Sequence, residues 1–320
     1  MATVLTLGGM ADLAAELVAV GKLTFFRNRT DFWWLFLSSI LFVLLVLFAL
    51  KREYSSDWRP LQRRFQGILE QHAQVDAARR FRLGVKQLWI PELQRVDRCV
   101  TCHLGYEWGS VLSADLPQPF APHPALPYLE AHSFLRFGCT SCHGGQGYAT
   151  ETKAAHGEVA HWEEPLLSEK LASAYGLSRR ELMQVRCNGC HRHDEGTVGL
   201  EFVDVGKRLV EEYVCTACHV ISGEGGLIAP ELTYVGDKNP EFLDFTHVDG
   251  PRTALNWHIE HFRDPQAVVP TSTMPNLGFS ERQATALALL MMSWTRETFP
   301  PAYIPVPRKV ASAGQGAVAQ

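Results

Sequence analysis

All eight cysteines of the 320-residue chain stand in four copies of one pattern, Cys-x-x-Cys-His. The four copies, here named motifs 1 to 4, occupy residues 99–103, 139–143, 187–191 and 215–219. Two thiols at this spacing can form thioethers with the two vinyl groups of one porphyrin, and the adjacent histidine then lies beneath the iron as its proximal ligand. The pattern therefore predicts four covalently bound c-type haems.

Each motif would supply two thioether sulfurs and one iron ligand. The cysteines predicted to attach haem are Cys99, Cys102, Cys139, Cys142, Cys187, Cys190, Cys215 and Cys218. The histidines predicted to be proximal ligands are His103, His143, His191 and His219. Disulfides or zinc sites can also use Cys-x-x-Cys pairs, but neither accounts for a histidine after every pair.

The sequence around motif 4 contains, in order, the features of a known kind of domain. Residues 202–213 predict an amphipathic helix that leads into the motif. A Gly- and Pro-rich turn follows at residues 223–232, then a loop with Met274 and Pro275, then an apolar helix over residues 280–294. Residues 200–300 thereby resemble the class I cytochrome c family.

This resemblance implies an all-α domain in which His219 and Met274 are the axial ligands of the fourth iron. It also implies that Pro230 braces the proximal histidine. Independently of the family, Ser280 with Gln283 three positions later predicts the N-cap of the closing helix.

The other three irons need a second axial ligand from elsewhere in the chain. Histidines outside the motifs stand at positions 72, 123, 132, 156, 161, 193, 247, 258 and 261. Neutral imidazole is a common haem ligand, and we predict His123, His132 and His156 as the distal ligands. His161 and His193 are held in reserve, and the sequence does not say which histidine serves which iron.

Two blocks in the middle of the chain resemble a second group of proteins. Trp89-Ile90-Pro91-Glu92-Leu93 and the glycine-rich stretch over residues 137–147 look like the multihaem cytochrome subunits that accompany bacterial quinol-oxidising, cytochrome bc-type membrane complexes. The resemblance covers residues 89–195 and implies a membrane cytochrome b, quinol-oxidising or reaction-centre complex as a partner. Read on their own, the glycines at positions 144, 145 and 147 would let backbone approach a porphyrin edge closely.

Residues 32–50 form an apolar run of 19 residues between Asp31 and Lys51. That length spans the hydrocarbon core of a bilayer as a helix, and Trp33 and Trp34 suit the membrane interface. The alternative is a cleaved signal peptide, whose apolar region is normally shorter and closer to the N-terminus. We therefore predict an uncleaved anchor that contacts membrane lipid.

Haem attachment takes place outside the cytoplasm, so the four motifs should lie in the periplasm and the N-terminus in the cytoplasm. The basic residues disagree with this orientation, because more of them follow the apolar run than precede it. The attachment chemistry outweighs the charge count, since it cannot occur on the cytoplasmic side.

The expected fold is mainly α, with one N-terminal transmembrane helix, an irregular or helical trihaem region packed around haem, and a C-terminal class I cytochrome c domain. The expected segments are a cytoplasmic lead-in at 1–31, the anchor at 32–50, a helical stalk at 51–98, the trihaem region at 99–198, the cytochrome c domain at 199–300 and a flexible tail at 301–320. Regular structure should be sparse in the trihaem region, because three porphyrins would make up much of its core.

Charge is unevenly distributed along the chain. Residues 196–320 contain nine Lys and Arg against fourteen Asp and Glu, whereas residues 1–195 contain twenty-one against twenty. This acidic end would either dock on a basic patch of a partner or merely keep the domain soluble. The chain has no basic patch suited to nucleic acid and no Gly-rich phosphate loop.

These observations favour an electron-transfer protein, rather than an enzyme, that passes electrons from a quinol-oxidising or photosynthetic membrane complex to a soluble periplasmic electron carrier. Methionine opposite histidine raises the potential of a haem, so electrons would run toward the C-terminal domain. The alternative is a multihaem reductase in which an open haem iron acts on a small nitrogen substrate. A redox or gas sensor is a third possibility, for which the sequence offers no signalling domain.

Overall fold

The computed structural model describes residues 29–159 and 166–306 of the chain. The predicted lead-in up to residue 28, the reserve ligand His161 and the predicted tail from residue 307 lie outside the described residues. The chain divides into two compact units, residues 1–59 and residues 60–320, and each is described by itself.

The first unit is dominated by helix α2 (Arg29–Tyr54, 26 residues), which contains the predicted anchor. Its side chains are exposed all round, including Trp34 at 72%. An apolar helix without a polar face is not the amphipathic kind that covers a soluble core. At about 1.5 Å per residue, α2 is longer than a hydrocarbon core of about 30 Å, and it is the one helix among the described residues with the length and composition to cross a membrane.

Helix α3 (Trp58–Gln71) begins two residues before the second unit, and α4 (Val75–Arg80) follows it. Helix α3 is strongly amphipathic, and its buried residues Phe65 and Leu69 pack in one cluster with Leu104 and Phe120 from the chain around motif 1. The segment predicted as a stalk is therefore helical over these two elements, but its apolar face is buried against the chain that carries the first motif.

The predicted helical stalk does not continue to residue 98. Strands β1 (Leu88–Ile90) and β2 (Arg95–Asp97) form an antiparallel hairpin in which Leu88 lies opposite Asp97. The 3₁₀ turn η1 (Pro91–Leu93) connects them. Proline at the first position of this turn fits the end of a strand, because it has no N–H to give to a ladder.

Short helical turns follow the hairpin. They are η2 (Cys99–Thr101), η3 (Leu104–Glu107), η4 (Pro127–Glu130), α5 (Phe134–Phe137), α6 (Thr140–His143), α7 (Thr152–Ala155) and α8 (Glu169–Ser173). None is longer than five residues, so regular structure is sparse here, as expected, but the predicted trihaem region also contains the twelve-residue helix α9 (Arg179–Cys190).

The C-terminal part of the unit has the longer helices α9 (Arg179–Cys190), α10 (Glu201–Glu212), α11 (Ala254–Arg263) and α13 (Glu281–Ser293). The shorter elements are η5 (Cys215–Ala217), β3 (Val220–Ile221), β4 (Glu224–Gly225), η6 (Val235–Asp237), η7 (Pro240–Phe242), α12 (Pro265–Val268) and η8 (Pro301–Tyr303). The described chain is thus mainly helical, as predicted.

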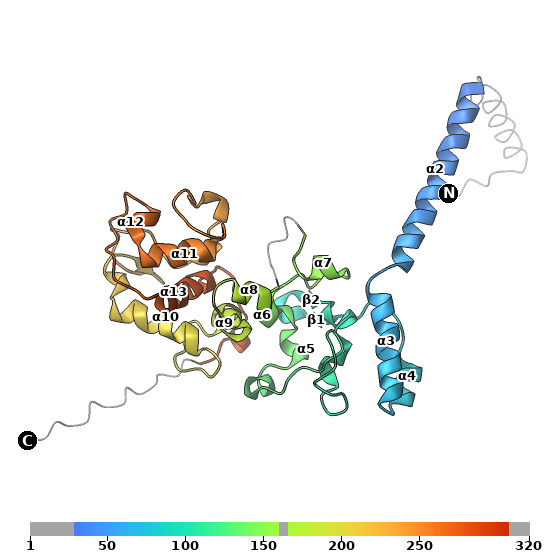
Figure 1. Ribbon diagram of the computed structural model, residues 1–320, viewed down its shortest axis with the longest axis horizontal. Coiled ribbons are helices and arrows are strands. Elements are labelled where there is room, and N and C mark those ends of the chain that lie inside the picture. Colours follow the sequence, from blue (N-terminus) through green and yellow to red (C-terminus); the bar gives the residue numbers. More distant parts are fainter. Residues whose placement is uncertain (1–28, 160–165, 307–320) are drawn as a thin grey trace, which may run out of the picture. The chain divides into compact units, whose positions relative to one another are not determined.

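Helix α13 is the centre of this part and packs against α9, α10 and α11 (Figure 1). Leu287, Leu289 and Leu290 are almost completely buried. Glycine at position 206 of α10 allows close contact with α13, because a Cβ there would come within 2.7 Å of the carbonyl oxygen of Ala286. The helix begins as predicted, since Ser280 and Gln283 form a complete capping box.

Candidate haem sites

All four motifs share one local geometry. In each, the backbone N–H of the histidine donates to the carbonyl oxygen of the first cysteine, at N–O distances of 2.9 to 3.1 Å. This helical turn brings the two thiols and the imidazole together. Motifs 1 and 4 lie at η2 and η5, motif 2 at α6, and motif 3 at the C-terminal end of α9. All eight cysteines are half-buried, and none forms a disulfide.

Each of the first three motif histidines lies close to one of the predicted distal ligands. The ring centres are 6.3 Å apart for His103 and His156, 6.1 Å for His143 and His123, and 6.1 Å for His191 and His132. Two imidazole rings that bind one metal ion from opposite sides, each through a nitrogen about 2 Å from the metal, have centres about 6 Å apart. The three ring distances fit a haem iron between each pair.

Two of the distal candidates have their ring orientation fixed by backbone. His132 Nδ1 donates to the carbonyl oxygen of Tyr128 at 2.7 Å, and His123 Nδ1 donates to that of Pro124 at 2.9 Å. A carbonyl oxygen can only accept, so in both neutral rings Nδ1 carries the proton. Nε2 is then left with the lone pair that a metal needs.

The proximal histidines have different partners at Nδ1. His219 donates to the carbonyl oxygen of Pro230 at 2.6 Å, which is the bracing that the resemblance implies. His191 faces the carboxylate of Asp194 at 2.8 Å. His143 accepts from the guanidinium of Arg179 at 3.0 Å. An arginine only donates, so the neutral ring of His143 carries its proton on Nε2 in this geometry and would have to lose it to bind iron there.

Burial keeps several of these groups uncharged at neutral pH. It lowers the pKa of His103, and it lowers that of His143 to about 4. The neutral ring is the form that binds a metal. Burial also raises the pKa of the Cys187 thiol to about 12 and that of Cys190 to about 11.

The first three motifs are neighbours in space. Cys139 of motif 2 packs against the apolar cluster that contains Val100 of motif 1, and the neighbouring Cys99 thiol raises the pKa of Cys139. Helices α6 and α9, which contain motifs 2 and 3, pack together. Groups attached to consecutive motifs would therefore lie next to each other.

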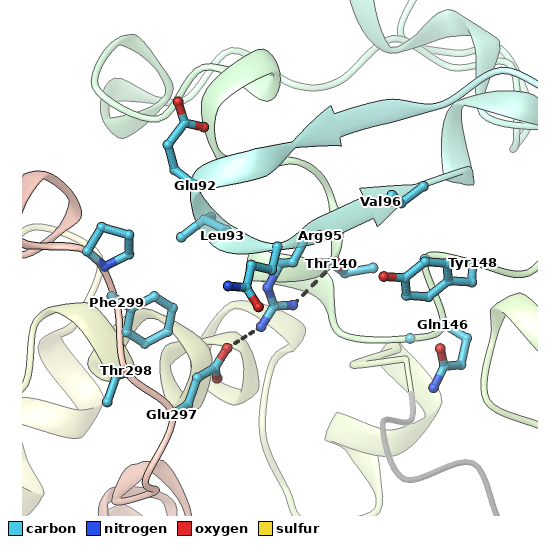
Figure 2. Close-up of a pocket in the computed structure, with 14 residues that line it drawn as sticks. Glu92, Leu93, Arg95, Val96, Thr140, Gln146, Tyr148, Glu297, Thr298 and Phe299 are labelled. Carbon is cyan, nitrogen blue, oxygen red and sulfur yellow. Dashed lines mark hydrogen bonds and ion pairs between the residues drawn. The ribbon is translucent and has the colours of Figure 1, made fainter.

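A series of polar contacts fixes the backbone and the Thr140 side chain of motif 2. The fully buried carboxylate of Asp97 accepts from the backbone N–H groups of Cys139 and Thr140 and from the hydroxyl of Thr140. Figure 2 shows the next link, in which Arg95 of β2 lies between Thr140 and Glu297. The hairpin thus connects motif 2 to the segment after α13.

These residues border a cleft of about 860 Å³ that is lined by residues 92–96, 145–148 and 297–300 together with Thr140. Its lining contains neither histidine nor cysteine, although Thr140 belongs to motif 2. Two glycines beside the cleft are required by close backbone packing within the protein. A Cβ on Gly147 would come within 2.3 Å of the carbonyl oxygen of Val96, and one on Gly145 within 2.7 Å of that of Ala155. Their predicted approach to a porphyrin stays a prediction.

Met274 and the remaining histidines differ in how deeply they are buried. Met274 is half-buried in the loop after α12, and its N–H donates to Ser272 Oγ at 3.3 Å. Its place opposite His219 stays a prediction. The reserve ligand His193 is exposed. His258 and His261 on α11 are buried and half-buried, and His261 stacks on Trp257.

Sequence reasoning missed Asp97, Arg179 and Asp194, which contact the motifs directly. Only Asp194 had a usable signal, since it follows His191 by three residues, the spacing of neighbours on a helical turn. Asp97 and Arg179 come from segments distant from the motif that they contact.

Comparison with known proteins gives one match. Residues 203–295, which contain motif 4 and Met274, match the family model described as Cytochrome c. No curated protein matches the chain, and no solved structure does. The first three motifs lie outside the matched segment. Within it, the chain contains a cytochrome c domain, whose family binds haem covalently and transfers electrons.

Proposed function

We propose that this protein is a membrane-anchored tetrahaem c-type cytochrome that carries electrons on the periplasmic side of the membrane. Its donor would be a quinol-oxidising or photosynthetic membrane complex, and its acceptor a soluble periplasmic carrier. The observation that carries the proposal is the set of three imidazole pairs at 6.1 to 6.3 Å, each joining one motif histidine to a histidine outside the motifs.

The pairs support a proposed distal ligand for each of the first three irons. His156 serves motif 1, His123 serves motif 2 and His132 serves motif 3. Met274 serves motif 4 by the resemblance of the matched domain to class I cytochromes c. Four irons with two protein ligands each have no open position for a substrate, which favours electron transfer over the reductase alternative.

Haem supplies an iron that cycles between the ferric and ferrous states, and the residues of the chain set where and at what potential it does so. The cysteines would fix each haem in place, and the paired histidines would hold its iron from both sides. Methionine opposite His219 raises the potential of the last site relative to bis-histidine sites. Electrons arriving at motifs 1 to 3 would therefore run toward the cytochrome c domain.

The test is a potentiometric titration of the holoprotein combined with low-temperature EPR of its oxidised form. We expect four low-spin components, one of them at higher potential than the rest. Met274→Ala should remove this high-potential component and leave the others, whereas the control Met292→Leu, in α13, should change nothing.

A second variant tests the pairing. His123→Met should raise one of the three lower potentials, because it converts one bis-histidine iron to His/Met ligation. A high-spin component in the unmodified protein that shifts on addition of nitrite or cyanide would contradict the proposal and support the reductase.

A further inference from the structure

The hydrogen bond between His191 and Asp194 has a charged acceptor, unlike the hydrogen bonds that fix three other histidine rings. His191 Nδ1 lies 2.8 Å from a carboxylate oxygen of Asp194. The rings of His219, His123 and His132 instead donate to the carbonyl oxygens of Pro230, Pro124 and Tyr128. His191 is therefore paired with an anion and these three rings with neutral groups.

The position of Asp194 is fixed by the turn that ends α9. Its backbone N–H donates to the carbonyl oxygen of His191 at 3.1 Å, and its side chain is only 8% exposed. Lys207 of α10 donates to the carbonyl oxygen of His191 at 3.0 Å and to that of Asp194. Helix α10 thus holds the turn, and the carboxylate stays aimed at Nδ1.

An anionic acceptor at Nδ1 changes what Nε2 can do. The carboxylate draws the Nδ1 proton toward itself, so the ring gains imidazolate character and becomes a stronger electron donor through Nε2. The effect is larger in a buried site, where electrostatic interactions are less screened. A stronger donor favours the ferric over the ferrous state of an iron bound at Nε2 and so lowers its potential.

We propose that Asp194 is a positioning residue that holds the haem of motif 3 at a lower potential than the bis-histidine haems of motifs 1 and 2. This inference rests on the proposed function, because it assumes haem at motif 3. It adds that the potentials do not rise steadily from motif 1 to motif 4, because motif 3 would have the lowest. A haem of such low potential is the strongest reductant of the four and would readily reduce the His/Met site, which has the highest potential.

The experiment compares Asp194→Asn with the unmodified holoprotein by potentiometric titration and low-temperature EPR. Asparagine keeps the shape of the side chain but removes the charge. We expect the midpoint potential of one bis-histidine component to rise and its g values to change, while the other three components keep theirs. Asp194→Glu, which retains a carboxylate, should keep the midpoint potential of the same component low. It provides a second measurement if the asparagine variant does not fold.

Two further variants identify the component and its cause. His132→Met marks the haem of motif 3 by raising its potential, and the same component must respond to Asp194→Asn. Glu201→Gln is the control, because this carboxylate of α10 accepts from the N–H of Gly199 at 2.8 Å and belongs to neither the His191–Asp194 pair nor the Lys207 contacts that hold the turn. It should leave every potential unchanged.

The proposal is overturned if Asp194→Asn moves no potential, or if Glu201→Gln moves the motif 3 potential equally, since the cause would then be charge at a distance. These outcomes leave the proposed function intact as long as His132→Met shifts one component. If His132→Met shifts none, the ligand pairing itself is wrong.

Discussion

Histidine protonation decides whether the paired rings can bind iron, because only an uncharged ring offers a lone pair. Burial depresses the pKa of His103 and of His143, to about 4 for the latter. For His123 and His132, a backbone carbonyl fixes the proton on Nδ1. The chain therefore presents several of its predicted ligands in the form and orientation that coordination needs.

The same physics predicts how pH affects the stability of the cytochrome c domain. His258 is 6% exposed, and its pKa falls from 6.5 to about 4, first because of burial and then because of His261 and Lys238. Its ring stays neutral in the folded state while the unfolded chain takes up a proton below pH 6.5, so stability is lost as pH falls from 6.5 to 4. The slope is about 1.4 kcal/mol per pH unit for one such histidine.

His258→Gln should therefore flatten the pH dependence of the free energy of unfolding, measured by denaturant titration at pH 7 and pH 5. His247→Gln is the control, because this histidine is exposed. Equal pH slopes for the His258 variant and the unmodified protein would show that burial of this ring does not matter.

Among the elements, α10 and α13 are in close contact at Gly206. We predict that Gly206→Ala destabilises the protein by about 1–3 kcal/mol, the usual cost of overpacking a core, because the new methyl group would come within 2.7 Å of a backbone oxygen that cannot rotate away. Thermal denaturation measures the effect.

Gly67→Ala should have the opposite effect on stability. Gly67 is also inside a helix, α3, but nothing lies within 4 Å of a Cβ there. Alanine should stabilise the helix by about 0.5–1 kcal/mol, because it restricts the unfolded chain more than glycine does. If both substitutions had the same sign, the argument from space at Gly206 would be wrong.

Sequence alone identified the elements whose signals are local. The Ser280–Gln283 pair predicted the start of α13, and amphipathic periodicity over residues 202–213 predicted α10 within one residue. The hairpin of β1 and β2 was missed, because strands of three residues are too short to show alternation. The histidine pairs could be listed but not assigned, since loops without periodicity bring together residues such as His132 and His191.

For the molecule as a whole, α2 is the element that would determine location. We expect the protein to remain in the membrane fraction after washes with high salt and alkaline carbonate, because a spanning helix is not removed by either. A version in which a cleavable signal sequence replaces residues 1–54 should be recovered soluble with its haems attached. Recovery of the unmodified protein as a soluble chain that begins after residue 50 would instead identify a signal peptide.

The acidic C-terminal part makes a prediction about electron exchange. If the excess of Asp and Glu over residues 196–320 guides docking, the rate of electron transfer to a basic soluble cytochrome should fall steeply as ionic strength rises. An acidic acceptor should show the reverse dependence and serves as the control. A rate to the basic acceptor that is independent of salt would mean that these charges only keep the domain soluble.

The central claim is that all four motifs attach haem, and the most direct measurement is the intact mass of the exported protein. We predict a mass that exceeds that of the polypeptide by four haem groups, and a loss of one haem when Cys99 and Cys102 are both replaced by alanine. A mass increase of a single haem, confined to the domain at residues 203–295, would contradict the account.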